Sequence, residues 1–207
     1  MNIVVTDSGT LNPGDLSWDE LKKLGECHIY GNSTQEETII RCKGAQIVVT
    51  NKVAFDKQTI EALPELKCIA ITATGYNIVD IETAKKKGII VMNVPVYGTK
   101  SVAQMVFALL LELTQHVGHH NETVHEGRWE KCDNFCYWDY PLVELANLTM
   151  GIIGCGQIGM ATANIAKAFG MKVIVYDVYT DHLAGKNLEV VDIDTIFTQS
   201  DVIQAVR

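Results

Sequence analysis

One stretch in the last third of the chain constrains its fold most strongly. The short apolar run Thr149–Ile153 leads directly into the glycine-rich segment Gly154–Gly159. Met160–Phe169 then has a helical pattern that ends at Gly170, and Met171–Asp177 is a second apolar run. This order predicts a strand, a tight turn, a helix and a second strand, which together form the repeating unit of a parallel α/β sheet.

The glycines in the turn have the spacing that dinucleotide-binding α/β units use. Gly154 allows the chain to turn sharply off the strand, and Gly156 leaves room for a pyrophosphate to approach the backbone. Gly159 allows the helix to pack closely on the sheet. The helix start, at Gln157 and Ile158, offers free N–H groups and the positive end of the helix dipole to phosphates. We therefore expect these residues to bind a dinucleotide.

The residue at the end of the second strand indicates which dinucleotide is bound. Asp177 follows Gly159 by 18 residues and can accept hydrogen bonds from the ribose hydroxyls. Its carboxylate would repel the 2′-phosphate of NADP, and Tyr176–His182 contains no Lys or Arg to neutralise that phosphate. The sequence therefore predicts NAD as the cofactor. The alternative is that the glycine-rich turn binds no ligand. We interpret Cys155 as a small residue that is tolerated in the turn.

The first part of the chain alternates short apolar runs with amphipathic segments. The predicted strands are Ile3–Thr6, His28–Tyr30, Ile47–Thr50, Cys68–Thr72 and Ile89–Asn93. The predicted helices are Trp18–Leu24, Gln35–Cys42, Lys57–Leu63 and Ile81–Lys87. Strict alternation predicts a parallel sheet covered on both faces. This part has no glycine-rich phosphate loop, so we do not expect the nucleotide to bind here.

A long apolar helix is predicted after Pro95. Ser101–Gln104 has the pattern of a capping box, and Met105–Leu113 is almost entirely apolar. We expect this helix to connect two domains, residues 1–95 and residues 96–207. The predicted fold class is therefore α/β, with two doubly wound parallel-sheet domains.

Composition and charge disfavour several kinds of partner. A net charge of −8 argues against nucleic acid or an anionic membrane, and no apolar run reaches the roughly 18 residues that a membrane span needs. Met1–Thr6 leads straight into a strand pattern without a signal sequence, so we expect a cytoplasmic protein with reduced cysteines. No carboxylate or thiol completes a site with His116, His119 and His120, so no metal is predicted.

With these parts in this order, the whole chain resembles the D-2-hydroxyacid dehydrogenase family. The matching segments are Ala73–Asp80, Asn93–Tyr97, Ser101–Gln104 and Gly151–Gly159. Three further segments are similar to its glycerate dehydrogenase (hydroxypyruvate reductase) branch: Thr50–Lys52, Phe107–Glu112 and Asp133–Trp138. The resemblance implies a flavodoxin-like substrate domain and a Rossmann NAD-binding domain. It also implies reduction of a small 2-keto acid by NADH, with hydroxypyruvate or glyoxylate as the expected substrate.

The resemblance also implies where the substrate binds, in a cleft between the domains. Thr74 and Gly75 match the family's loop whose backbone N–H groups hold the substrate carboxylate. Asn51 and Lys52 match the neighbouring loop, and two backbone donors beside a cation suit a small carboxylate. For Lys52, a solvated surface charge is the alternative.

The segment 129–140 is rich in aromatic residues, which are enriched in interface cores. In the family this segment belongs to the dimer contact, so the resemblance implies a homodimer. Trp138 lies about where a tryptophan can reach the substrate site of the partner subunit. The alternative is a loop folded onto its own domain.

The catalytic groups of the family are not found in this chain. The reaction needs an arginine, and a histidine oriented by a glutamate as general acid; in the family all three lie beyond the position of Arg207. Ser200–Ile203 resembles the start of a third strand, so we expect an incomplete NAD-binding domain with one edge of Met150–Ile153 open and prone to aggregation. Three interpretations stay open: a truncated dehydrogenase that is inactive alone, a non-catalytic NAD-binding or dimerising regulatory protein, and an active enzyme with relocated catalytic groups.

Overall fold

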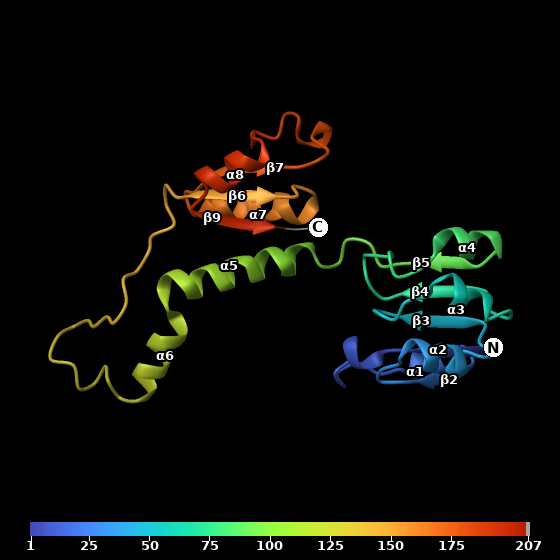
Figure 1. Ribbon diagram of the computed structural model, residues 1–207. Coiled ribbons are helices and arrows are strands. Elements are labelled where there is room, and N and C mark those ends of the chain that lie inside the picture. Colours follow the sequence, from blue (N-terminus) through green and yellow to red (C-terminus); the bar gives the residue numbers. More distant parts are fainter. Residues whose placement is uncertain (206–207) are drawn as a thin grey trace. The chain divides into compact units, whose positions relative to one another are not determined.

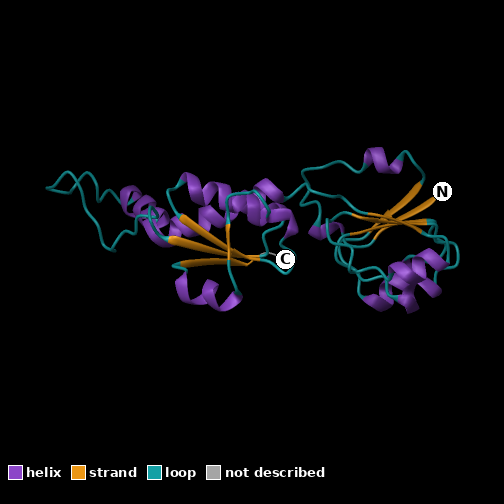
Figure 2. Ribbon diagram, turned by 90° about the horizontal axis from the view of Figure 1, so that it is seen from above, coloured by secondary structure: helices purple, strands orange, loops and turns teal. Residues whose placement is uncertain are grey.

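The computed structural model describes residues 1–205 of the 207-residue chain. The chain divides into two compact units, the first from Met1 to Tyr97 and the second from Gly98 onward. Each unit contains one parallel sheet with helices packed on its faces (Figures 1 and 2). The predicted class, α/β with two parallel-sheet units, is confirmed.

The N-terminal unit contains five parallel strands in the order β2-β1-β3-β4-β5. The strands are β1 (Asn2–Val5), β2 (Glu26–Ile29), β3 (Ile47–Thr50), β4 (Cys68–Ile71) and β5 (Ile90–Met92). The helices are α1 (Asp19–Lys22), α2 (Gln35–Arg41), α3 (Lys57–Glu61) and α4 (Ile81–Lys86), with a 3-10 turn η1 (Ser8–Thr10). Because β2 and β3 flank β1 on opposite sides, the winding of the chain reverses there, and ligands of such sheets bind at this kind of switch point.

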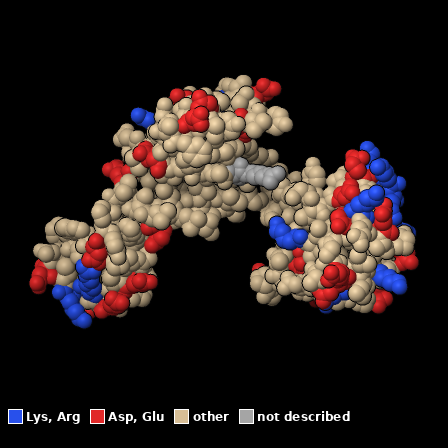
Figure 3. Space-filling view, in the orientation of Figure 1, with Lys and Arg blue, Asp and Glu red and all other residues tan. Residues whose placement is uncertain are grey.

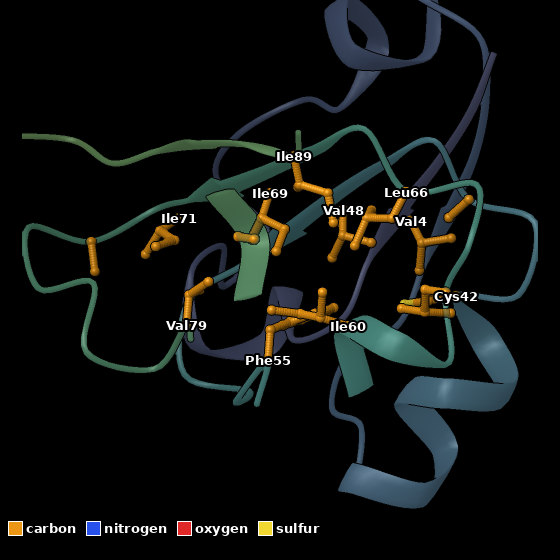
Figure 4. Packing of buried hydrophobic residues seen from close by; sticks show 14 residues of the cluster. Val4, Cys42, Val48, Phe55, Ile60, Leu66, Ile69, Ile71, Val79 and Ile89 are labelled. Carbon is orange, nitrogen blue, oxygen red and sulfur yellow. The ribbon is translucent and has the colours of Figure 1, made fainter. Parts of the chain in front are cut away.

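Two apolar clusters cover the faces of this first sheet. Successive side chains of a strand point to opposite faces, so Val4 packs in one cluster and Ile3 in the other. The larger cluster joins the strands to Cys42 at the end of α2, to Ile60 of α3 (Figure 4) and to Ala84 of α4. The smaller cluster joins them to α1. Both faces are therefore buried, as strict alternation of strands and helices predicts.

The C-terminal unit contains four parallel strands in the order β8-β7-β6-β9. The strands are β6 (Thr149–Ile153), β7 (Lys172–Tyr176), β8 (Glu189–Val190) and β9 (Val202–Ala205). The helices are α5 (Thr99–Gln115), α6 (Val117–His125), α7 (Gln157–Ala168) and α8 (Ile193–Gln199), with a 3-10 turn η2 (Asp181–Leu183). Phe107 and Leu110 of α5 join Ala163 and Ala166 of α7 in the cluster that buries one face of the sheet. On the other face, Ile196 of α8 is fully buried.

The structure corrects the predicted strand order. Val202–Ala205 pairs with β6 on the side opposite β7 and is therefore the fourth strand of the unit, whereas the third strand is β8. Hydrophobic periodicity predicts Ser200–Ile203 as the third strand because β8, two exposed residues long, contains no apolar run that could reveal it. The edge of β6 that we expected to be open is covered by β9.

The start and end of α5 also differ from the prediction. The helix begins after Gly98 without a side-chain cap, so the capping box expected at Ser101–Gln104 does not form, since these residues already lie inside the helix. A left-handed residue, His116 (φ 50°), separates α5 from α6, so His116 does not lie in the same helix as His119 and His120. Neither α5 nor any other helix of the described residues could cross a lipid bilayer.

Candidate functional site

The glycine-rich turn leaves β6 at its carboxyl end. Gly154 has φ 88°, a left-handed conformation that favours glycine, and its N–H donates to the Tyr176 carbonyl at 2.9 Å. A Cβ on Gly159 would lie 2.3 Å from the Gly154 carbonyl oxygen, so α7 starts in close contact with the turn. A Cβ on Gly156, in contrast, would meet nothing within 4 Å. Two glycines are thus required by the fold, and the third faces open space.

The first turn of α7 offers N–H groups to an outside acceptor. Gly156 is the N-cap residue and has no side chain with which to cap the helix. No acceptor within residues 1–205 takes the N–H groups of Gly156, Gln157 or Ile158. Free N–H groups at a helix start, together with the helix dipole, attract an anion such as a phosphate.

Asp177 follows β7 and lies beside the turn. Its Oδ2 accepts the Cys155 N–H at 2.7 Å, and its Oδ1 accepts the Tyr179 N–H at 3.0 Å. The hydrogen bond from Tyr179 is the largest influence on the pKa of Asp177 and lowers it; partial burial opposes this, and the Cys155 N–H and nearby His182 lower it further. The carboxylate is therefore ionised at neutral pH. Each oxygen keeps a lone pair for a further donor.

The residue between the first two glycines is held from both ends. Cys155 is fully buried, and its carbonyl oxygen accepts a hydrogen bond from Nε2 of His182 at 2.9 Å. Burial, and to a lesser extent Asp177, raises the pKa of the Cys155 thiol, so the side chain is a neutral apolar group. The sequence reasoning missed His182, because a single histidine in a loop carries no pattern that would point to this contact.

The predicted substrate residues of the N-terminal unit lie at one edge of its sheet. Asn51 and Lys52 follow β3, and Thr74 and Gly75 follow the neighbouring strand β4. The carboxyl ends of parallel strands meet at the same edge, so the structure brings these four residues to one end of the sheet. Trp138 belongs to the other unit, where its side chain is 69% exposed.

The loop after β4 is fixed by side-chain contacts that leave its N–H groups free. Thr74 Oγ1 donates to the Val94 carbonyl at 3.0 Å, and Asn93 Nδ2 donates to the Thr74 carbonyl at 2.8 Å. Among the described residues, none accepts the backbone N–H of Thr74 or of Gly75. Two adjacent N–H groups without acceptors can bind a carboxylate.

The loop after β3 is held by the carboxylate of Asp7, which is not among the predicted site residues. Asp7 is only 3% exposed, and its oxygens accept the N–H of Asn51 at 2.9 Å and of Lys52 at 2.6 Å. The Asn51 side chain donates to Thr10 Oγ1 at 2.9 Å, whereas the Lys52 ammonium has no ion-pair partner in the described part of the chain. Lys52 and Asp7 line a cavity of about 360 Å³. A signal for Asp7 existed, because it directly follows the first apolar run, as Asp177 follows β7.

The aromatic segment near Trp138 is tied to α6. Asp139 accepts hydrogen bonds from both terminal nitrogens of Arg128, and its Oδ2 lies 2.6 Å from His119 Nε2. The Arg128 contact, followed by that of His119, holds the pKa of Asp139 far below its ordinary value. The OH of Tyr137 lies 2.8 Å from Thr123 Oγ1. The segment is therefore anchored to its own unit through several polar contacts.

One face of α5 is apolar and exposed. Its buried face packs on α7, where the rings of Phe107 and Phe169 stack with centroids 5.3 Å apart. On the opposite face, apolar side chains recur every three or four residues, a spacing that forms one stripe. The stripe consists of Val102, Met105, Leu109 and Leu113, of which Leu109 is 60% and Leu113 74% exposed. Figure 3 shows mostly uncharged atoms over this helix.

Comparison with known proteins identifies the family. The model of the D-isomer specific 2-hydroxyacid dehydrogenase, catalytic domain, matches residues 3–199. The chain is 51% identical over 207 residues to a hydroxypyruvate reductase of Blautia hydrogenotrophica, covering 98% of this chain and 64% of that protein. It is 41% identical over 170 residues to a glycerate dehydrogenase of Methylorubrum extorquens, covering 82% and 52%. The chain belongs to the D-isomer specific 2-hydroxyacid dehydrogenase family, and the predicted resemblance is confirmed.

Solved structures share the fold over the whole chain. A D-lactate dehydrogenase from Aquifex aeolicus, complexed with NAD and lactic acid, superposes with a TM-score of 0.79 at 26% identity. An acyclic imino acid reductase, in complex with NADPH and D-Arg, superposes with a TM-score of 0.78 at 30% identity. This chain is covered completely in both cases and spans 60% and 65% of those chains. The two neighbours carry different nicotinamide cofactors.

Proposed function

We propose that this chain binds NADH and a small 2-keto acid in the manner of a D-2-hydroxyacid dehydrogenase, with hydroxypyruvate or glyoxylate as the substrate. The observation that carries the proposal is the start of α7. Its N–H groups lack acceptors within the described residues, and Asp177 lies beside them. Membership of the family supports the reaction type, and the names of the relatives from Blautia hydrogenotrophica and Methylorubrum extorquens support the substrate class.

The residues around the turn fit the adenosine diphosphate half of NAD. The N–H groups of Gly156, Gln157 and Ile158 would bind the pyrophosphate, and the missing side chain of Gly156 leaves room for it. Asp177 would accept both hydroxyls of the adenosine ribose. Because its lowered pKa keeps it ionised, it would repel the extra phosphate of NADP. When bound, NADH would supply the hydride.

The loops after β3 and β4 fit the carboxylate of the substrate. The N–H groups of Thr74 and Gly75 are adjacent donors, and the Lys52 ammonium supplies a positive charge without an ion-pair partner among residues 1–205. Together they would bind and orient a small 2-keto acid by its carboxylate. Trp138 is proposed as a further substrate contact, made to the site of the partner subunit in a homodimer.

We further propose that these 207 residues bind both ligands without turnover. Reduction of a keto group needs a proton donor at the keto oxygen. His119, Asp139 and Arg128 are residue types that such chemistry uses, and His119 lies close to Asp139. However, both terminal nitrogens of Arg128 donate hydrogen bonds to Asp139. The charges of Arg128 and Asp139 are therefore paired with each other and not available to bind a substrate. We interpret the cluster as an anchor for the aromatic segment.

The exposed stripe of α5 supports a homodimer. Leu109 and Leu113 expose apolar area, and the aromatic side chains of Trp129 and Phe135 in the same unit are exposed as well. Burying such a stripe against a second copy removes apolar surface from water, which favours association.

Sedimentation velocity should give a dimer for the wild-type chain and a monomer for Leu109→Glu. Phe197→Glu, a matched change at an exposed residue of α8, should leave the dimer intact; a monomeric wild-type chain contradicts this part of the proposal.

Titration with NADH and NADPH tests the cofactor proposal. We expect tighter binding of NADH, and for Asp177→Ala a loss of roughly tenfold in NADH affinity with a weaker preference over NADPH. Asp181→Ala removes the same charge from a nearby exposed residue and should change neither value. An unchanged preference in Asp177→Ala contradicts the role of Asp177.

Addition of hydroxypyruvate or glyoxylate to the NADH complex tests the proposed lack of turnover. NADH oxidation at about 1 per second or faster, the range of ordinary enzymes, contradicts it. NADH binding without turnover, combined with a specific protein partner other than a second copy, would favour the non-catalytic regulatory alternative.

A further inference from the structure

His182 reaches the glycine-rich turn from the middle of the segment between β7 and β8. It lies in η2, which is anchored by Leu183, a residue 4% exposed that packs in the core of the C-terminal unit. From there its Nε2 lies 2.9 Å from the Cys155 carbonyl oxygen. A carbonyl oxygen can only accept a hydrogen bond, so Nε2 must carry the hydrogen.

This contact fixes more than one atom of the turn. The Cys155 carbonyl and the Gly156 N–H belong to one peptide group, and no peptide bond of the described chain is cis. In a trans peptide the C=O and N–H bonds point in opposite directions. Fixing the Cys155 carbonyl toward His182 therefore aims the Gly156 N–H to the opposite side.

The preceding peptide group is fixed as well. The Cys155 N–H donates to Asp177 Oδ2 at 2.7 Å, so the loop after β7 holds two consecutive peptide groups of the turn. Glycine has wide backbone freedom, and Gly154 and Gly156 on either side of Cys155 would otherwise leave this turn free to move. A ligand that binds a mobile turn must also order it, which costs affinity.

We propose that His182 is a positioning residue for the pyrophosphate: through the Cys155 carbonyl it presets the Gly156 N–H as a phosphate donor. The inference rests on the dinucleotide site of the proposed function. His182 does not itself touch the cofactor in this arrangement. The groups that would touch it are the Gly156 N–H and its neighbours at the start of α7, which have no acceptor among the described residues.

Two substitutions at His182 and two probes test this role. His182→Leu removes the donor, whereas the amide of His182→Gln can still donate to the Cys155 carbonyl. ADP contains the pyrophosphate and adenosine does not, so we expect His182→Leu to weaken ADP and NADH about three- to tenfold and leave adenosine unchanged. His182→Gln should recover most of the loss. His125→Leu, at an exposed histidine of α6, should bind like the wild type.

The outcomes separate this inference from the proposed function. If the wild-type chain binds no NADH, the proposed function fails and the role of His182 fails with it. If the wild type binds NADH and His182→Leu binds ADP equally well, only the role of His182 is overturned. An equal loss for adenosine and ADP, or a His182→Gln variant as weak as His182→Leu, also overturns it, because a general disturbance of the loop would then explain the data. Thermal unfolding of each variant shows whether it is folded.

Discussion

Helices α7 and α8 follow parallel strands of the same sheet, yet only α8 has a side chain that caps its first turn. α8 begins after Asp192, whose carboxylate accepts the Thr195 N–H at 2.7 Å. α7 begins after Gly156, which has no side chain to cap the helix. Both N-cap residues have extended backbone, with φ −74° and −71°, so the difference lies in the side chain.

A helix that is capped by its own residue has less to offer a ligand. In the N-terminal unit, α2, α3 and α4 each begin with a capping side chain, from Thr34, Asp56 and Asp80 respectively. Such caps satisfy N–H groups that an anion would otherwise bind. α7 combines a start without a cap with a left-handed glycine, Gly154, a tightly packed glycine, Gly159, and a neighbouring carboxylate, Asp177. This combination distinguishes the proposed binding turn from the structural helix starts.

The largest expected effect comes from filling the close contact between the turn and α7. A Cβ in Gly159→Ala would lie 2.3 Å from the Gly154 carbonyl oxygen and 3.2 Å from Ile152 Cγ2, so backbone must move. We expect a loss of about 3 kcal/mol in the free energy of unfolding, measured with urea, and loss of NADH binding. Gly156→Ala meets no atom within 4 Å and should cost less than about 1 kcal/mol. Equal stability of the two variants would show that the close approach is not a constraint.

A single substitution should convert the start of α7 into one like that of α8. Gly156→Asp puts a capping carboxylate on extended backbone similar to that of Asp192. We expect the variant to keep its stability, because the new side chain caps the helix. Its NADH affinity should fall about 100-fold, equivalent to about 2.7 kcal/mol, because the carboxylate occupies and repels the phosphate position. NADH binding at wild-type strength would show that the uncapped start of α7 does not bind the phosphates.

The sequence reveals the glycine-rich turn far better than the contacts that hold it. The glycine spacing is readable because the φ of Gly154 favours glycine and the close approach at Gly159 leaves no room for a side chain. Asp7 is marked by its place directly after an apolar run, and His182 by nothing comparable. Their partners lie 44 and 27 positions away along the chain, so no local pattern encodes the contacts themselves. Strand β8 is two exposed residues long, so hydrophobic periodicity could not reveal it or place β9 beside β6.

In the N-terminal unit a carboxylate holds a loop and not a helix start. Asp7 accepts the N–H groups of Asn51 and Lys52 in the loop after β3. Asp7→Ala leaves the N–H groups of Asn51 and Lys52 without their buried acceptor. We expect a loss of about 2 kcal/mol in the free energy of unfolding and faster hydrogen exchange at these two amides. Exchange at the Cys155 amide should stay as it is. Asp15→Ala, at an exposed acid, serves as the control, and slow exchange at Asn51 in Asp7→Ala would contradict the role of Asp7.

The smallest effect tests whether the cap of α8 is purely structural. The N–H of Thr195, followed by its hydroxyl, holds the pKa of Asp192 below its ordinary value of about 3.9. The cap therefore stabilises fully above about pH 4, and its contribution is lost as the pH falls through the lowered pKa of the folded state. At pH 7, Asp192→Ala should lower Tm by about 3 °C without changing NADH affinity, and the difference from wild type should shrink in acid. Asp194→Ala removes a charge from the same helical turn without removing the cap, so an equal loss of Tm there would assign the effect to charge alone.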